Sequence, residues 1–185
     1  MSIYRRGFVA SALAAAVFLA APLAQAADER LLYLDTKDGR VTIKLRPDLA
    51  PKHVERIEKL AKEHFYDGIV FHRVIEGFMA QAGDPTGTGL NGSRYLDLKA
   101  EFSQEPFKRG TLGMARQPGD NDSANSQFFI CYADAPNLNG KYTIFGEVVS
   151  GMDVVDKIKK GSKSANGMVD GPDKIIKMRV AGDES

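Results

Sequence analysis

The sequence predicts a single, mainly β domain, built as a closed barrel or a sandwich of about eight short strands with two helices. Two observations carry this prediction. Short apolar runs recur along the chain, several of them alternate apolar with polar residues, and turns rich in Gly, Asn or Pro separate them. Only two stretches show helical spacing, and no internal repeat or linker interrupts the pattern. With 185 residues, the chain is long enough for one domain with one hydrophobic core.

The first expected elements are a hairpin and a helix. Leu31–Thr36 and the alternating run Val41–Leu45 flank Asp38-Gly39, which is a strong hairpin turn signal. Pro51 suits the first turn of a helix, and apolar residues recur at helical spacing from there to about Lys62. The remaining expected elements are strands at Ile69–Ile75, Met79–Gly83, Thr111–Met114, Phe128–Cys131 and Tyr142–Val148, a short helix over Met152–Ile158, and a last strand over Lys174–Val180.

The first 26 residues have the composition of an export signal. Arg5-Arg6 precedes the apolar, Ala-rich run 8–21, and the segment ends in Ala24-x-Ala26. This order is typical of a cleaved secretory signal peptide, and the apolar run is too short to span a membrane as an anchor. We therefore expect residues 1–26 to be removed and residues 27–185 to form the mature domain in the periplasm. The paired arginines fit a twin-arginine signal as well as a Sec signal, so the export route stays open.

Charge and cysteine content exclude several classes of protein. Lys+Arg number 25 and Asp+Glu number 24, so the chain lacks the basic excess of a dedicated nucleic-acid binder. The near-neutral charge and the short length favour a monomer. Cys131 is the single cysteine, which rules out an internal disulfide framework and a Cys-rich zinc module. Its apolar neighbours Phe128–Ile130 predict a buried structural thiol.

Two local patterns resemble ligand loops and fail on context. Residues 87–92 match G-x-G-x-x-G, but a dinucleotide site needs this turn between a strand and a helix, and no helical spacing follows here. Asp120–Asp122 opens like a calcium loop, but the sixth position is Asn125 and the twelfth is Cys131. We expect neither segment to bind a cofactor or an ion.

The three histidines are the remaining candidates for a metal centre. His53, His64 and His72 could in principle hold a catalytic zinc, which would make the protein a metal-dependent hydrolase. No two of them have the spacing of a helical metal pair, so surface or hydrogen-bonded histidines are the preferred interpretation. We expect no metal and no cofactor.

The segment from Phe71 to Asp84 contains the strongest candidate for chemistry. On a strand, Arg73 shares a face with apolar neighbours, where a cation is costly unless it has a partner or a ligand. After the Glu76-Gly77 break, Gln81 follows the large apolar residues Phe78 and Met79. From spacing alone, a functional groove and an ordinary core strand pair with a salt-bridged Arg73 remain equally open.

This segment, F-H-R-V-I-E-G-F-M-A-Q-A-G-D, resembles the signature of the cyclophilin-type peptidyl-prolyl cis-trans isomerases. Further blocks agree: Gly113-Met114-Ala115, Ser126–Ile130, Leu138–Val148 and Gly151–Val155. The resemblance covers about 31–180 and is most like exported bacterial members. It implies a closed eight-stranded antiparallel barrel capped by two α-helices, and an enzyme that rotates Xaa–Pro bonds to assist the folding of exported proteins.

The resemblance also implies roles for individual residues. Arg73 would be the catalytic arginine, with Gln81 as the polar group that bonds the substrate backbone. The proline ring would lie against apolar residues, namely Phe78, Met79, Phe129 and Leu138. Ala115 and Arg116 would bind the residues before the proline, and Tyr142 would contact its far side. The implied partners are proline-containing unfolded or flexible polypeptides, without a metal, nucleotide, nucleic acid or membrane anchor.

The chain departs from the family pattern at several positions. Asn137 stands where many eukaryotic members carry Trp, which implies weak cyclosporin binding. Arg116 replaces a common Asn, which affects preference before the proline, while Glu76 and Ala82 replace Pro and Gly. The loop between Ala115 and Ser126 is two residues longer than in the eukaryotic pattern. A non-catalytic module that holds Pro segments, or a chaperone, is the alternative function.

Overall fold

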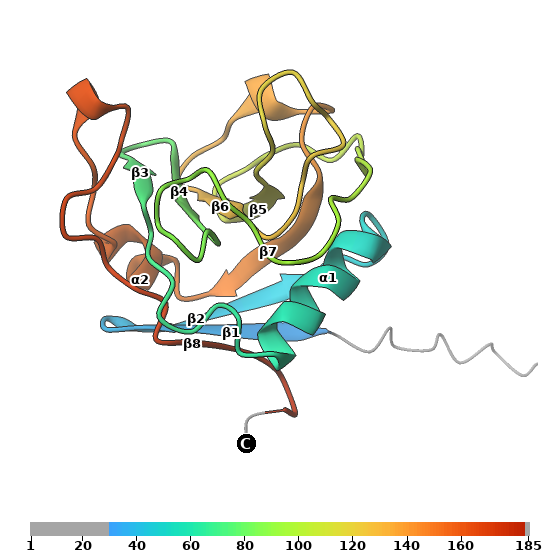
Figure 1. The fold of residues 1–185 in the computed structure, drawn as a ribbon, viewed down its shortest axis with the longest axis horizontal. Coiled ribbons are helices and arrows are strands. Elements are labelled where there is room, and N and C mark those ends of the chain that lie inside the picture. Colours follow the sequence, from blue (N-terminus) through green and yellow to red (C-terminus); the bar gives the residue numbers. More distant parts are fainter. Residues whose placement is uncertain (1–29, 184–185) are drawn as a thin grey trace, which may run out of the picture.

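The computed structural model describes residues 30–183, so the predicted signal peptide at residues 1–26 lies outside the described residues. The described chain folds into one curled antiparallel sheet with a helix at either side (Figure 1). The strands are β1 (Leu31–Thr36), β2 (Gly39–Leu45), β3 (Arg73–Ile75), β4 (Met79–Ala82), β5 (Thr111–Met114), β6 (Phe128–Cys131), β7 (Ile144–Ser150) and β8 (Lys177–Val180). The helices are α1 (Pro51–Lys62) and α2 (Met152–Lys157), with short 3-10 helices η1 (Pro136–Leu138) and η2 (Lys163–Ala165).

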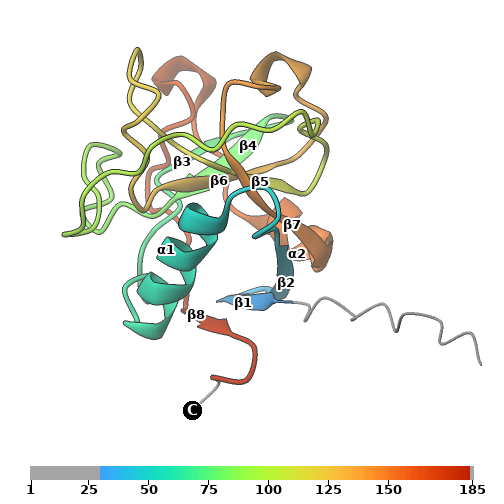
Figure 2. The same cartoon turned by 90° about the vertical axis from the view of Figure 1, so that its right-hand side faces the viewer.

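The expected closed barrel is wrong in one respect, because the sheet is an open half-barrel. Its strand order is β3-β4-β6-β5-β7-β2-β1-β8, and the edge strands β3 and β8 do not pair in the described part of the chain. Figures 1 and 2 show β1, β2 and β8 at one end of the curl and β3 to β6 at the other. The irregular segment 161–175 lies along the β3 edge and forms backbone hydrogen bonds with it. Examples are Val74 N to Gly167 O (2.7 Å) and Val169 N to His72 O (3.0 Å), which pair backbone groups that a neighbouring strand would otherwise bond.

Every predicted element is present, but two strands are markedly shorter than expected, and β7 (Ile144–Ser150) lies two residues further along the chain than the predicted Tyr142–Val148. The predicted strand Ile69–Ile75 contains only β3, preceded by an isolated bridge at Val70, because its earlier residues bond to the irregular segment 161–175. The last strand begins at Lys177 rather than Lys174, and the Asp38-Gly39 turn closes the β1–β2 hairpin as expected.

The strand register places a row of four residues side by side across the β3 end of the sheet. Arg73 pairs with Gln81, Gln81 with Phe129, and Phe129 with Gly113, across β3, β4, β6 and β5. Residues directly opposite each other in adjacent strands project from the same face. Arg73, Gln81 and Phe129 therefore share one face.

The two faces of the sheet carry separate apolar clusters. The larger cluster fills the inside of the curl and includes the buried face of α1, with Val54, Ile57 and Leu60. The smaller cluster contains Met79, Phe129 and Cys131, which lie on the opposite face because strand side chains alternate. Both helices contribute to the larger cluster, with α1 packed against β8 and β7 and α2 against β2. No helix within residues 30–183 is long and apolar enough to cross a membrane.

Helix α1 has no capping side chain at its own N-cap residue, and a side chain from a distant loop caps its N-terminus instead. Its N-cap is Ala50, which has no side-chain cap, while Pro51 occupies the first turn and needs no N–H partner. The carboxylate of Glu101 accepts hydrogen bonds from the backbone N–H groups of Lys52 (3.3 Å) and His53 (3.1 Å). An anion at a helix N-terminus is favourable, so this contact ties the loop 83–110 to the helix.

Candidate active site

The smaller apolar cluster contains every apolar residue that the sequence assigned to a proline-binding surface. Its buried members are Met79, Phe107, Phe129, Cys131, Ala135, Leu138 and Ile144, and its half-buried members are Leu49, Ile75, Phe78, Ala115 and Tyr142. These residues come from β3, β4, β6, η1, β7 and the loops between them. The fold thus gathers residues from Leu49 to Ile144 into one apolar surface.

Phe129 lies at the centre of this surface and is fixed from three sides. Its ring stacks on Phe107 with centroids 5.8 Å apart, and Tyr142 meets it edge-on at 5.8 Å. Beneath it lies Gly113, where a Cβ atom would come 2.4 Å from Phe129 Cζ. Only glycine leaves room for the ring at this position of the sheet. Phe107 had no role in the sequence-based prediction, because nothing in its surroundings pairs it with Phe129.

Arg73 is held at the edge of the apolar surface by neutral acceptors. Its Nε donates to the backbone oxygen of Asn166 (3.0 Å), its Nη2 to Asn166 Oδ1 (3.2 Å), and its Nη1 to Gln81 Oε1 (3.3 Å). Within residues 30–183 it forms no ion pair with a carboxylate, so the alternative of a salt-bridged core arginine is wrong. Burial lowers the pKa of Arg73, but a guanidinium stays charged in proteins. The geometry presents a partly desolvated cation with spare N–H groups.

Asn166 was not identified from the sequence, although it supplies two of the three acceptors of Arg73. It ends η2 with a φ of 52°, a left-handed conformation that Asn tolerates better than most residues. The next residue, Gly167, approaches β3 so closely that a Cβ atom would lie 2.4 Å from Ile75 Cγ1. The Asn-Gly pair signals a turn, but no pattern indicates which of the preceding strands it meets.

Loss of the Asn166 side chain is expected to lower kcat/KM about tenfold or more, the effect of losing one hydrogen bond to a charged group. Asn166→Gly tests this, because glycine keeps the left-handed backbone and the carbonyl acceptor while removing Oδ1. The measurement is a protease-coupled assay on a proline peptide. The control is Ser164→Gly in the same 3-10 helix. Activity of Asn166→Gly within twofold of wild type would contradict the assignment.

The two glutamines of the site form a hydrogen-bonded pair. Gln81 Nε2 donates to Gln127 Oε1 at 2.9 Å, while Gln81 Oε1 accepts from Arg73. Gln127 belongs to the Ser126–Ile130 block but carried no role in the sequence-based prediction. Its position is fixed further by the backbone bond from Ala115 N to Gln127 O (2.9 Å). The apolar surface and these polar groups together make up the groove of the candidate site, whose polar side is a connected set of neutral amides ending on one cation.

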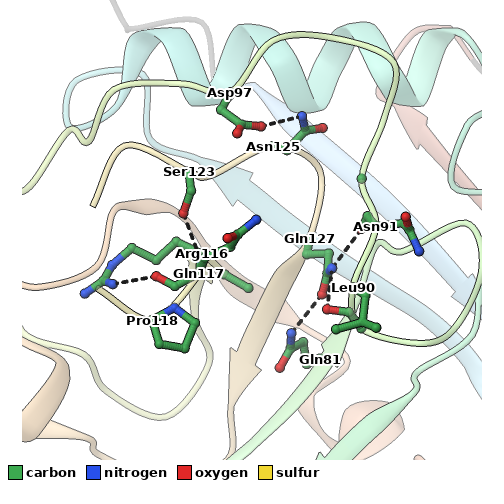
Figure 3. Close-up of a pocket in the computed structure, with 13 residues that line it drawn as sticks. Gln81, Leu90, Asn91, Asp97, Arg116, Gln117, Pro118, Ser123, Asn125 and Gln127 are labelled. Atoms are coloured by element: carbon green, nitrogen blue, oxygen red, sulfur yellow. Dashed lines mark hydrogen bonds between the residues drawn. The ribbon is translucent and has the colours of Figure 1, made fainter. Parts of the chain in front are cut away.

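A cavity of about 360 Å³ opens beside this amide pair (Figure 3). Gln81, Ala115 and Gln127 form its side toward the apolar surface, and the loop 89–92 and the segment 115–118 enclose it. The guanidinium of Arg116 turns to the backbone oxygens of Gln117 (3.1 Å) and Lys141 (3.3 Å), and its Cζ lies 4.6 Å from the centre of the Tyr142 ring. Arg116 thus braces Tyr142 rather than projecting toward Gln127.

Neither the histidines nor the cysteine takes part in the hydrogen bonds that join Arg73, Gln81 and Gln127, although Cys131 belongs to the smaller apolar cluster. His53 is buried and its Nδ1 lies 2.6 Å from Glu101 Oε2, whereas His64 is exposed with Nδ1 3.5 Å from Asp67. His72 is buried without a side-chain partner in the described residues, which the sequence-based interpretation did not anticipate. No group of three or more potential metal ligands occurs within residues 30–183. Cys131 is buried as predicted, and burial raises its pKa to about 12.

The buried histidines predict that the protein loses stability in mild acid. Burial lowers the pKa of His72 and of His53 below the ordinary value of 6.5. In the unfolded chain both side chains are exposed to water, and their pKa returns to that ordinary value. The unfolded state therefore binds more protons below pH 6.5, and the free energy of unfolding falls from there down to the folded-state pKa values. Urea denaturation at pH 7.5, 6.0 and 5.0 measures this slope. His72→Phe should flatten it while the exposed-site control His64→Gln keeps it; equal slopes in all three proteins would refute the prediction.

The fold and the site together define a cyclophilin-type protein: a curled eight-stranded sheet with two helices that presents a cation and an amide pair beside an aromatic surface. The family model for "Cyclophilin type peptidyl-prolyl cis-trans isomerase/CLD" matches residues 31–180. The chain belongs to this family and is a peptidyl-prolyl cis-trans isomerase.

Curated relatives carry the same name. A "Probable peptidyl-prolyl cis-trans isomerase" of Brucella suis biovar 1 (strain 1330) is 56% identical over 193 residues, which cover 95% of this chain and 98% of the relative. "Peptidyl-prolyl cis-trans isomerase B" of Bacillus subtilis (strain 168) is 40% identical over 141 residues, which cover 75% and 97%.

Solved structures share the fold. A cyclophilin-type isomerase of Cryptosporidium parvum, crystallised in the presence of the dipeptide Ala-Pro, matches with a TM-score of 0.73 and 29% identity, covering 81% of this chain and 98% of that one. The cyclophilin AquaCyp293 from Hirschia baltica matches with a TM-score of 0.74 and 25% identity, covering 85% and 76%.

Proposed function

We propose that Arg73 is the catalytic residue and that the protein rotates Xaa–Pro bonds in exported polypeptides, assisting their folding. The observation that carries this proposal is the state of the Arg73 guanidinium. It is half-buried, bonded to three neutral acceptors and free of a carboxylate partner within residues 30–183. Such a cation retains N–H groups that a substrate can use.

The physical task is to stabilise a twisted amide. Rotation breaks the resonance of the prolyl amide, with a barrier of about 18–20 kcal/mol, and uncatalysed exchange takes tens to hundreds of seconds. In the twisted state the prolyl nitrogen becomes pyramidal and regains a lone pair. A guanidinium aimed at this nitrogen binds the twisted form better than the planar one, which is differential binding of the transition state. No proton transfer, covalent intermediate or cofactor takes part.

The residues around Arg73 divide the work of holding the substrate. Phe78, Met79, Phe129 and Leu138 grip the proline ring, with Tyr142 on its far side. Gln81 bonds the peptide backbone. The neighbouring cavity, at Ala115 and Arg116, takes the residues before the proline. The apolar surface also lowers the local dielectric, which strengthens the interaction between Arg73 and the prolyl nitrogen.

A protease-coupled assay on a short Ala-Pro peptide tests the proposed roles. The wild-type protein should accelerate cis-trans exchange at catalytic concentrations, and Arg73 and Phe129 variants should lose most of that acceleration. The alternative is a module that holds Pro segments or acts as a chaperone without useful turnover. A protein that binds the peptide and leaves its exchange rate unchanged would establish this alternative.

We further propose that residues 1–26 direct the protein to the periplasm and are removed there. The supporting observations are the paired arginines, the short apolar run and the Ala24-x-Ala26 end. Cell fractionation with N-terminal sequencing of the mature protein tests this proposal, and replacing Arg5-Arg6 with Lys-Lys separates the twin-arginine from the Sec route. A full-length chain retained in the cytoplasm would contradict it.

The exposed Asn137 also suggests weak cyclosporin binding. It lies on η1 beside the buried Leu138, where it offers no aromatic ring to a large apolar ligand. Titration with cyclosporin should give inhibition only at high concentration, and Asn137→Trp should lower that concentration. Tight inhibition of the wild-type protein would contradict the proposal.

A further inference from the structure

A buried carboxylate behind the active site has no role in the proposed mechanism. Asp84 follows β4 and is fully buried, and no cation pairs with it within residues 30–183. Its Oδ1 accepts hydrogen bonds from the backbone N (2.7 Å) and Oγ1 (2.8 Å) of Thr86. Its Oδ2 accepts from Thr88 Oγ1 (3.1 Å) and from the backbone N–H groups of Gly89 (2.7 Å), Leu90 (3.0 Å) and Asn91 (3.2 Å).

These contacts explain the G-x-G-x-x-G match at residues 87–92. The loop does wrap its N–H groups around an anion, but the anion is the chain's own carboxylate. Gly87 and Gly89 have φ values of +70° and +83°, which glycine adopts without strain. Burial raises the pKa of Asp84, but the hydrogen bonds from Thr86, Thr88 and Asn91 outweigh it and hold the pKa at about 2. The carboxylate is therefore ionised at neutral pH and fixes the shape of the loop.

The same loop points two carbonyl groups at the active site. Gln127 Nε2 donates to the backbone oxygens of Gly89 (3.1 Å) and Asn91 (2.8 Å). Figure 3 shows Gln127 between this loop and Gln81. An amide side chain has donors at one end and an acceptor at the other. Because both donors of Gln127 face the loop, its oxygen must face Gln81.

The orientation of the Gln127 amide determines the orientation of Gln81, and through it the contact with the catalytic arginine. The oxygen of Gln127 accepts from Gln81 Nε2 at 2.9 Å, which turns Gln81 Oε1 toward Arg73 Nη1 at 3.3 Å. If Gln127 flipped, its NH2 group would face the NH2 group of Gln81, and its oxygen would face the carbonyl oxygens of Gly89 and Asn91. The chain of hydrogen bonds thus has one favourable direction, and the loop around Asp84 sets it.

We propose that Asp84 is a positioning residue for catalysis: by holding loop 86–91 in place, it orients the amides of Gln127 and Gln81 and so fixes the guanidinium of Arg73. This inference rests on the proposed role of Arg73. Asp84 touches no substrate and acts only through the loop and the two glutamines.

The test compares Asp84→Asn with the wild-type protein and with Asp153→Asn. The control makes the same charge change on the exposed surface of α2, where Asp153 forms a long ion pair with Lys157. In Asp84→Asn, the new side-chain NH2 group would face backbone N–H donors, so the loop should loosen. We expect kcat/KM for a short Ala-Pro peptide to fall about tenfold, carried mainly by kcat, with KM within about threefold.

The NMR signals of the side-chain amides report whether the two glutamines keep their hydrogen bonds. A general loss of stability does not change these signals as long as the protein is folded. In the wild-type protein both N–H groups of Gln127 are bonded, and Asp84→Asn should shift the signals of Gln127 and Gln81 toward those of solvent-exposed amides at a temperature where the protein is folded. Thr88→Val removes one donor to Asp84 and is the second variant. It should move the same signals and lower kcat about twofold, less than in Asp84→Asn because the five other donors to the carboxylate remain.

The outcomes separate this inference from the proposed function. An inactive wild-type protein would contradict the role of Arg73 itself. With an active wild type, a folded Asp84→Asn that keeps wild-type kcat and wild-type amide signals would overturn the positioning role. If Asp84→Asn does not fold, Thr88→Val decides in the same way: displaced amide signals with lower kcat support the role, and wild-type values for both overturn it.

Discussion

Replacing Arg73 with alanine is expected to lower kcat/KM by at least about 100-fold, the loss typical of removing one preorganised donor from an active site. The Arg73 guanidinium is the cation that the amide pair of Gln81 and Gln127 holds in place. All three of its acceptors are neutral, and no carboxylate in the described chain compensates its charge. Arg73→Lys should recover less than a tenth of the loss, because one ammonium cannot reach Asn166, Gln81 and the substrate together. A protease-coupled assay measures both variants.

The matched control for Arg73→Ala is Arg40→Ala in the β1–β2 hairpin. Arg40 pairs with Asp35 (2.8 Å) and stacks on Tyr33, remote from the groove. Its removal changes the net charge equally and should leave kcat/KM within twofold. Near-wild-type activity in Arg73→Ala would remove the basis of the proposed mechanism.

Replacing Phe129 with alanine is expected to lower kcat/KM by about 30-fold or more, chiefly through KM. The ring is the centre of the apolar surface and packs on both Phe107 and Tyr142, so its loss removes the main contact that we propose for the proline ring. Cutting back a buried phenylalanine also costs about 3–5 kcal/mol of stability. Urea denaturation measures that cost, and the assay runs at a temperature where the variant is folded.

Phe65→Ala separates the two effects of the Phe129 substitution. Phe65 packs edge-on against Tyr66 in the larger cluster, at a ring distance of 5.2 Å, and does not belong to the groove. Phe65→Ala should lower the free energy of unfolding and leave kcat/KM of the folded protein within twofold. If both variants lost activity in proportion to stability, Phe129 would have no special place in substrate binding.

The proximity of Arg73, Gln81 and Phe129 follows from short strands with a fixed register, while their roles in catalysis stay predictions. Arg73 and Gln81 belong to one hairpin with a short turn, so spacing alone places them on one face. The position of Phe129 beside Gln81 depends on the pairing of β4 with β6, and the family resemblance rather than any local pattern indicated it.

What the sequence missed depends on contacts between distant segments. Asn166 reaches Arg73 across 93 positions through an irregular segment that has no periodicity to reveal it. The same segment covers the β3 edge, which is why the expected closed barrel is an open half-barrel. Asp84 stands in the signature and Gln127 in a recognised block, but their connection exists only once the loop 86–91 is folded between them.

The central claim is that a guanidinium beside an apolar surface favours the twisted prolyl amide over the planar one. Exchange NMR of an Ala-Pro peptide tests it most directly, because it observes the cis and trans populations at equilibrium. With catalytic amounts of wild-type protein, exchange cross-peaks should appear on a sub-second timescale and should vanish with Arg73→Ala, although the peptide still binds. Equal exchange with the two proteins, or none with either, would contradict the claim.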